Sequence, residues 1–309
     1  MISSNRILKD KNVHVFITGS GGPLNSEKRV ASGIAVIAGG QFILVDIGPG
    51  TYRNIDLLQL PVDSLKAIFI THFHSDHIGD LGEANMMSWA YGREQALEVY
   101  GPHGIEEVVD GFVKAYKFDT KYRINHHGEG LLPPEASKPL SKVIHIDKKS
   151  EKELCYDING LKVYAFIVDH SPVNPALGYR IEYKGNVIVI TGDCVKTENL
   201  VRHSEGADIL FSDAISHEML NNLIKNAKRL NFTRAVRILS DIQDYHMDPV
   251  TAAELASEAR VKKLVLVHIT PPLLNSRLEK LYVKGLEDVF NGQIIIGEDR
   301  MKFKLEPKS

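Results

Sequence analysis

The chain has 309 residues, 43% of them hydrophobic, which is enough to fill the core of one large domain or two small ones and excludes disorder as the main state. Lysine and arginine number 37 against 39 aspartates and glutamates, so the formal charge of -2 gives no overall positive field for nucleic acid or an anionic membrane. No apolar run approaches the roughly 18–20 residues that span a bilayer, and the start MISSNRILKDKN lacks the apolar stretch of a secretory signal. These features predict a cytoplasmic protein without a membrane partner, although a trimmed export signal would leave no trace in this sequence.

Apolar, β-branched runs alternate with helix-period segments along almost the whole chain, which predicts an α/β fold. The expected strands, in chain order, cover residues 13–18, 33–38, 42–46, 67–71, 98–100, 161–168, 177–183, 187–191, 209–212, 263–267, 293–297 and 302–305. The expected helices cover residues 81–96, 105–118, 217–228, 250–259 and 277–290. Because several strands follow one another directly, mixed sheets fit this pattern better than purely parallel ones.

We expect a single domain over residues 1–309. One polar, turn-rich stretch at about residues 117–152 contains His126, His127 and several glycines and prolines, and it predicts a long loop excursion from that domain. The candidate ligands described below lie on both sides of this stretch, which argues against two separable halves.

The segment AIFITHFHSDH, residues 67–77, runs from an apolar strand directly into four side chains that bind metals. Alternate residues of an extended segment project to the same side, so His72 and His74 can hold one ion together. Asp76 and His77 follow where the chain turns, and they can face a second ion. The alternative is a polar strand end with solvated histidines, but four potential ligands within six positions favour a metal site.

The same pattern recurs three times further along the chain. The apolar run YAFIV leads to His170, VIVIT leads to Asp193 after a glycine, and KLVLV leads to His268. Any one of these residues alone would be a core histidine or a turn residue. Because ligands of open α/β sheets bind at the carboxyl ends of the strands, the segments are expected to converge on one site. Together they supply seven ligands, enough for two ions with open positions.

These motifs resemble those of the metallo-β-lactamase superfamily. THFHSDH matches the H-x-H-x-D-H signature, and the later VDH, TGD and LVLVHITP segments follow in the expected order. Within the superfamily the chain is similar to the ribonuclease Z and arylsulfatase-like branch, which shares the GSGGP segment, the GP loop at residues 100–104, and the combination of Asp213 with His246. The resemblance implies a four-layer αββα sandwich of two mixed β-sheets, with two metal ions at one edge.

The resemblance also implies a role for each of these residues. The first ion would be bound by His72, His74 and His170, the second by Asp76, His77 and His268, with Asp193 bridging them. His246 would protonate the leaving group, oriented by Asp213, which stands where ribonuclease Z has a glutamate; a surface histidine at a helix start is the alternative for His246. The cofactors are predicted to be two divalent ions, Zn²⁺ in the first place, with Mn²⁺ or Fe²⁺ as alternatives.

The chemistry expected of such a site is ester hydrolysis. Two ions roughly 3.5–4 Å apart lower the pKa of a shared water towards about 7, so the nucleophile would be a hydroxide held between them. Asp76 would accept a hydrogen bond from this hydroxide and fix its direction, as a third catalytic residue beside His246 and Asp213. The leading hypothesis is a dinuclear hydrolase of phosphodiester or sulfate esters of modest size.

The chain departs from ribonuclease Z in two places. Ribonuclease Z carries a long exosite arm between its third metal histidine and the bridging aspartate, whereas His170 and Asp193 are separated by room for one hairpin only. The motif P-x-K-x-R-N is absent, since this chain reads PLNSEKRVAS. A tRNA 3′-processing endonuclease without the usual arm is therefore the alternative, and nucleic acid is not the favoured partner. A non-catalytic, metal-stabilised scaffold is a further alternative, and a homodimer is possible because relatives are often dimers.

Overall fold

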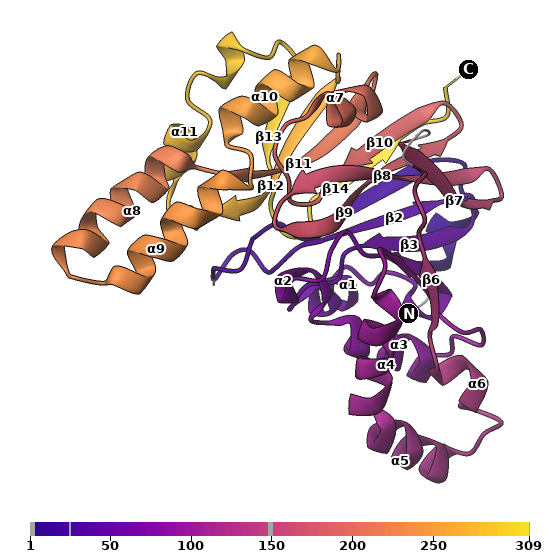
Figure 1. The fold of residues 1–309 in the computed structure, drawn as a ribbon. Helices are drawn as coiled ribbons and strands as arrows, with labels where there is room; N and C mark the ends of the chain where they lie inside the picture. The colour runs from indigo at the N-terminus through magenta and orange to yellow at the C-terminus, as the bar shows by residue number, and fades with distance from the viewer. Residues whose placement is uncertain (1–3, 25, 148–150, 309) are drawn as a thin grey trace.

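A computed structural model describes residues 4–24, 26–147 and 151–308 of the chain. Two seven-stranded sheets pack face to face, and helices cover both outer faces (Figure 1). The α/β sandwich of two mixed sheets predicted from the sequence is confirmed.

The first sheet has the strand order β14-β1-β2-β3-β4-β5-β6. Its strands are β1 (Val13–Gly19), β2 (Gly33–Ala38), β3 (Gln41–Val45), β4 (Leu65–Phe69), β5 (Glu98–Gly101), β6 (Leu140–Val143) and β14 (Lys302–Leu305). Antiparallel pairing joins β14, β1, β2 and β3, whereas β3, β4, β5 and β6 run parallel.

The second sheet has the strand order β13-β12-β11-β10-β9-β8-β7. Its strands are β7 (Lys152–Ile158), β8 (Leu161–His170), β9 (Val173–Tyr183), β10 (Asn186–Ile190), β11 (Ile209–Ile215), β12 (Lys263–Thr270) and β13 (Gln293–Ile296). The strands β7 to β10 pair antiparallel, whereas β10 to β13 run parallel. Both sheets are therefore mixed.

The central strands are buried on both faces, which explains why their sequences are continuous apolar runs. Because side chains alternate along a strand, Val15 and Ile17 of β1 lie in the core between the sheets, beside Phe211 of β11. Phe16 points the other way and packs with Tyr52 of α1 (Thr51–Leu57). This alternation produces three apolar layers, one between the sheets and one under each group of helices.

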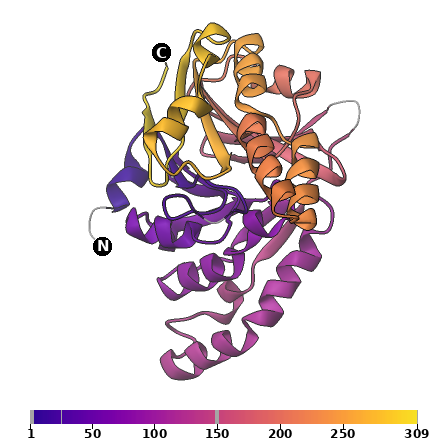
Figure 2. The same ribbon diagram turned by 90° about the vertical axis from the view of Figure 1, so that its left-hand side faces the viewer.

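The helices divide between the two outer faces, and the α4–α6 region extends away from the edge of the first sheet (Figure 2). The first sheet is covered by α1, α2 (Ser75–Ile78), α3 (Leu81–Ala90) and α4 (Ile105–Ala115), and α5 (Lys117–His127) and α6 (Pro134–Ser137) continue outward from them (Figure 1). The second sheet is covered by α7 (Glu198–Ser204), α10 (Pro249–Glu258) and α11 (Ser276–Tyr282), and α8 (His217–Arg229) and α9 (Thr233–Asp241) form a hairpin that extends beyond it (Figure 1). Short 3-10 turns are η1 (Ser4–Lys9), η2 (Val62–Ser64), η3 (Ile242–Asp244) and η4 (Leu286–Asp288). Among the described residues, no helix combines the length and the apolar character needed to cross a bilayer.

The stretch at 117–152 differs from the predicted loop excursion, since its described part contains α5, α6 and β6. Helix α5 continues from α4 after Tyr116, and none of its side chains is buried. It therefore has no apolar stripe by which the sequence could reveal it. The expected helix over 277–290 is also interrupted: α11 ends at Tyr282, and Gly285 adopts a φ of 78° before η4.

Candidate metal centre

The seven candidate ligands lie together at one edge of the two sheets, where strands β4, β8, β10 and β12 end. They are His72 and His74 after β4, Asp76 and His77 on α2, His170 at the end of β8, Asp193 after β10, and His268 in β12. Because the carboxyl ends of neighbouring parallel strands meet at one edge, residues far apart in the sequence become neighbours. The structure brings together all the positions that the sequence singled out, while their roles as ligands stay a prediction.

Three histidines and one aspartate form the first cluster. One ligand atom each from His72, His74, His170 and Asp193 lies within 4.8 Å of all the others. Nε2 of His72 is 2.9 Å from Nδ1 of His74 and 3.8 Å from Oδ2 of Asp193. His72 and His170 are buried, whereas His74 is exposed, so this cluster opens towards solvent on the His74 side.

The second cluster contains two histidines and two aspartates, all buried: Asp76, His77, Asp193 and His268. Oδ2 of Asp193 is 3.2 Å from Nε2 of His77 and 3.2 Å from Nε2 of His268. Oδ2 of Asp76 is also 3.2 Å from Nε2 of His268. Asp193 belongs to both clusters, which is the position required of a bridging ligand.

Two of the candidate ligand histidines form hydrogen bonds, through the ring nitrogen that faces away from the cluster, with groups that the sequence did not single out. Nδ1 of His77 donates to Oδ2 of Asp46 at 2.8 Å, and Asp46 also accepts from the backbone N–H of Thr71. Nδ1 of His170 donates to the backbone oxygen of Tyr245 at 2.9 Å. Such partners fix which ring nitrogen is free to bind metal. Asp46 follows the apolar run FILV, so the pattern that identified Asp193 could have found it, whereas a backbone carbonyl leaves no signal in a sequence.

Burial keeps the histidines of the first cluster neutral. It lowers the pKa of His72 far below its ordinary value and the pKa of His170 to about 4. A neutral imidazole offers a lone pair to a metal without first losing a proton. These two residues are therefore prepared to bind an ion.

The carboxylates determine the protonation of the second cluster. Burial acts to lower the pKa of His77, but Asp193 and Asp46 outweigh it and raise this pKa well above its ordinary value. Burial would raise the pKa of Asp193, yet His268 and His77 hold it well below the usual range. Asp193 is thus a carboxylate, and a metal in this cluster must displace a proton from His77.

His246 and Asp213 form a pair beside the two clusters. Nδ1 of His246 donates to Oδ2 of Asp213 at 3.0 Å, and Asp213 is 2% exposed. Burial raises the pKa of Asp213 despite this hydrogen bond. The His246 ring stacks on that of His268 with centroids 5.1 Å apart, and its other nitrogen, Nε2, is free of protein partners among the described residues. The pair has the geometry of an oriented proton donor.

The donor set fits divalent metal ions. Imidazole nitrogens and carboxylate oxygens are the usual ligands of zinc, manganese and iron. Nε2 of His170 is buried and has no hydrogen-bond partner among the described residues, although its Nδ1 is bonded. A buried nitrogen without a partner is costly, and coordination of an ion by Nε2 would remove that cost.

One cavity lies next to Asp76. It has a volume of about 230 Å³, and Gly22, Pro23 and Pro49 form part of its wall. A Cβ atom on Gly22 would lie 2.8 Å from Cε1 of His268, so the absence of a side chain lets this loop lie against this candidate ligand. A second cavity, of about 120 Å³ between α3 and α4, is remote from the ligands.

Residues of the chain match a known protein family. The family described as "Beta-lactamase superfamily domain" matches residues 41–269 of the chain, a range that contains every candidate ligand. The chain belongs to the beta-lactamase superfamily. Membership of this metallo-β-lactamase family implies divalent metal ions and hydrolase chemistry.

The chain is also homologous to enzymes named ribonuclease Z. Ribonuclease Z of Mycolicibacterium gilvum (strain PYR-GCK) is 30% identical over 298 residues, which cover 96% of this chain and 97% of that protein. Ribonuclease Z of Mycobacterium bovis (strain BCG / Pasteur 1173P2) is 30% identical over 299 residues, which cover 96% and 99%. The resemblance predicted from the sequence is therefore confirmed.

Solved structures share the fold. The metallo-beta-lactamase fold protein YhfI from Bacillus subtilis superposes with a TM-score of 0.67 at 19% identity, covering 95% of this chain and 100% of that one. Human tRNase Z, short form, superposes with a TM-score of 0.66 at 24% identity, covering 94% and 99%. These likenesses confirm the predicted metallo-β-lactamase fold.

The predicted lack of an exosite arm between His170 and Asp193 is confirmed. Residues 171–192 are all described, and they form β9 and β10, which pair antiparallel and turn at Lys184 and Gly185.

Proposed function

We propose that this chain is a metal-dependent phosphodiesterase that cleaves RNA, with the 3′ end of precursor tRNA as the first substrate to test. The observation that carries the proposal is the His246–Asp213 pair, a proton donor held beside two ligand clusters that share Asp193. The sequence ranked a small phosphate or sulfate ester above nucleic acid. Homology to proteins named ribonuclease Z along almost the whole chain supports placing nucleic acid above the small ester.

The two clusters would hold one divalent ion each, with zinc the first choice. The ligands would be His72, His74 and His170 for one ion, Asp76, His77 and His268 for the other, and Asp193 for both. Bound divalent ions lower the pKa of water and neutralise negative charge on the oxygens of a phosphoryl group.

The protein's own groups would orient the reactants and move the proton. Oδ1 of Asp76 makes no hydrogen bond among the described residues, so it can accept one from the attacking water and direct it. Nε2 of His246 would donate its proton to the departing oxygen, while Asp213 holds Nδ1 and stabilises the charged imidazole. This assignment gives each of the three predicted catalytic residues one action.

A second candidate substrate is a small phosphodiester or sulfate ester. The β9–β10 hairpin favours it, because this hairpin stands where ribonuclease Z has the arm that holds tRNA. A small ester needs no contact beyond the cavity beside Asp76. Such a substrate would agree with the prediction from the sequence, in which nucleic acid is an alternative partner and not the favoured one.

The test is a hydrolysis panel with zinc-loaded protein, with and without chelator. It contains a precursor tRNA with a 3′ trailer, bis-p-nitrophenyl phosphate and p-nitrophenyl sulfate, and Asp193→Asn is the inactive control. We expect chelator-sensitive cleavage of the precursor at one position. Turnover of the small esters alone would favour the second candidate, and no turnover of any of them would favour a scaffold stabilised by metal.

A further inference from the structure

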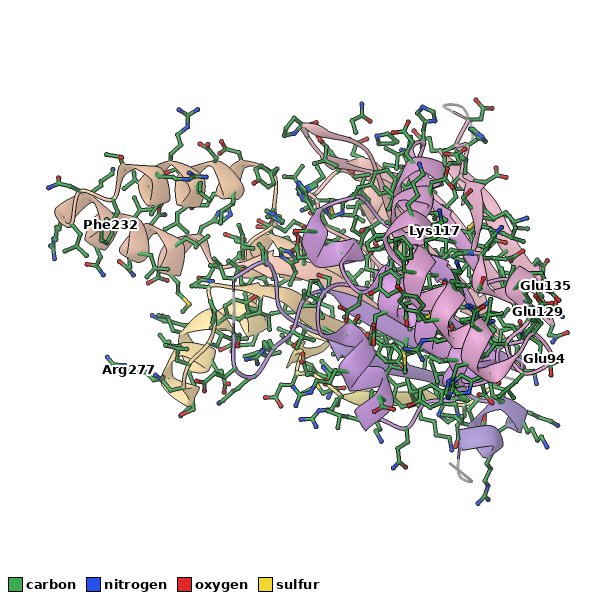
Figure 3. All side chains as sticks on the ribbon, turned by 90° about the horizontal axis from the view of Figure 1, so that it is seen from below. Glu94, Lys117, Glu129, Glu135, Phe232 and Arg277 are labelled. Atoms are coloured by element: carbon green, nitrogen blue, oxygen red, sulfur yellow. The ribbon has the colours of Figure 1, made fainter. Side chains whose placement is uncertain are left out.

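The α8–α9 hairpin, residues 217–241, projects from the body of the molecule as a separate finger. Figure 1 shows the two helices side by side, extending beyond the sheets, and Figure 3 places Phe232 near their far end. Helix α8 has 13 residues, so the tip lies about 20 Å from the base at a rise of 1.5 Å per residue.

The base of the hairpin is fixed at the rim of the metal centre. Before α8, the backbone N–H of Ser216 donates to the oxygen of Thr270, two residues after the ligand His268. After α9, η3 leads into Tyr245, whose backbone oxygen accepts from His170, and then into His246. A molecule that is held along the hairpin is therefore directed towards the site.

The outer half of the hairpin carries positive charge only. The 13 residues from Lys225 to Arg237 contain Lys225, Lys228, Arg229, Arg234 and Arg237 and no acidic residue, in a chain whose formal charge is -2. All five are exposed, and in the described part of the chain only Arg237 forms an ion pair, with Asp241 at 3.1 Å. Four cations at the tip are thus available to an external anion.

Apolar side chains lie exposed among these cations. Leu230 and Phe232, at the turn between the helices, are 63% and 59% exposed. Helix α9 has no buried residue, so this surface is not needed for the core. Cations beside an exposed aromatic ring fit a nucleic acid, since cations bind phosphates and the ring stacks on a base.

We propose that the α8–α9 hairpin binds the backbone of an RNA substrate and presents it to the metal centre. The inference rests on the proposed function, because it names the surface that would hold the RNA. RNA carries a negative charge at every nucleotide, which matches the density of cations at the tip. A second copy of this chain, with a formal charge of -2, offers no comparable density of negative charge. A small ester cannot reach from the site to a tip about 20 Å away, so the hairpin serves a polymer.

The experiment compares two triple variants with the wild-type chain. Lys228→Gln/Arg229→Gln/Arg234→Gln removes charge from the tip, and the control Lys11→Gln/Lys66→Gln/Lys304→Gln removes the same charge from exposed positions outside the hairpin. Binding of a fluorescein-labelled precursor tRNA transcript is measured by anisotropy in EDTA, over a range of salt concentrations. Kinetics on the same RNA and on bis-p-nitrophenyl phosphate follow with zinc.

The tip variant is expected to bind RNA at least about tenfold more weakly, and its slope of log K against log salt should be about two units shallower, because three phosphate contacts are lost. KM for RNA should rise in parallel, with kcat and all kinetics on bis-p-nitrophenyl phosphate unchanged.

Equal RNA affinity and equal salt dependence in the two triple variants would overturn the inference, as would a parallel loss of activity on bis-p-nitrophenyl phosphate. Binding to phosphatidylserine vesicles in place of RNA would also overturn it. RNA cleavage that does not depend on the hairpin refutes this inference alone, whereas hairpin-dependent RNA binding without cleavage refutes the proposed function alone.

Discussion

Replacement of His246 by alanine tests the proposed route of the proton. His246 is the candidate donor to the leaving group, and it is not one of the seven ligands predicted from the sequence. With Asp193 and Asp213 it forms a third cluster, whose ligand atoms lie within 4.8 Å of one another. A positioned general acid contributes about 10²–10⁴-fold, or about 3–5 kcal/mol of transition-state stabilisation. The loss should depend on the leaving group. A ribose or methyl alkoxide needs a proton to depart, whereas p-nitrophenolate leaves without one.

The structure also sets the cost of this substitution to stability. Oδ2 of Asp213 would lose its 3.0 Å hydrogen bond from His246 and keep the 3.4 Å hydrogen bond from the backbone N–H of Cys194, while Oδ1 has no partner in the described part of the chain. Loss of the shorter hydrogen bond of a buried carboxyl group costs about 1–3 kcal/mol, which lowers Tm by several degrees without unfolding the protein. Asp213→Asn is the companion variant, and its effect should be far from additive with that of His246→Ala if the two residues act as a pair.

The assay measures kcat/KM on RNA, on a methyl phosphodiester and on bis-p-nitrophenyl phosphate, with metal content by elemental analysis. We expect His246→Ala to lose about 10²–10⁴-fold on the first two substrates and less than about tenfold on the third, at unchanged metal content. An equal loss on all three substrates, or a loss of metal, would show that His246 does not act as the proton donor.

Three further predictions concern the ligands. Asp46→Ala removes the partner of His77 Nδ1 and should weaken metal affinity by about 10–100-fold in competition with a chelating dye; unchanged affinity would refute the supporting role. Gly192 has a φ of 62°, and a Cβ there would lie 2.9 Å from Cβ of Thr71. Gly192→Ala would therefore strain the backbone next to Asp193, and it should lower both Tm and metal content. Wild-type values of Tm and of metal content in this variant would contradict the prediction. Because the pKa of His77 is raised, this residue keeps its proton at neutral pH when no metal is bound, and metal uptake releases that proton. The apparent affinity for metal should therefore rise about tenfold per pH unit. Equal metal affinities at about pH 6 and about pH 8 would contradict this prediction.

The sequence predicts the fold where burial determines it. Strands buried on both faces, such as β1 and β3, appear as apolar runs and were located within a residue or two. Helix α9 carries apolar residues at helical spacing, a signal from which it could have been predicted, although none of its side chains is fully buried. Helix α5 has neither a buried side chain nor such a stripe. A helix held by its neighbour and not by an apolar stripe leaves no periodic signal in a sequence.

The site was predictable where side chains supply the ligands. His72, His170 and His268 follow or end apolar strands, and that pattern reveals them. The backbone oxygen of Tyr245 leaves no signal in the sequence. The cations of the α8–α9 hairpin are visible in the sequence, but their place beside the rim depends on how the chain folds back to it. The net charge of the whole chain argued against RNA, because it averages over a tip whose charge has a single sign.

Anomalous X-ray scattering at the zinc edge, from crystals of the zinc-loaded protein, tests the central claim most directly. The account predicts two peaks, one on each side of Asp193. The first should contact His72, His74 and His170, and the second Asp76, His77 and His268. A single peak, or zinc bound only elsewhere on the molecule, would contradict a two-ion centre and the hydrolytic chemistry built on it.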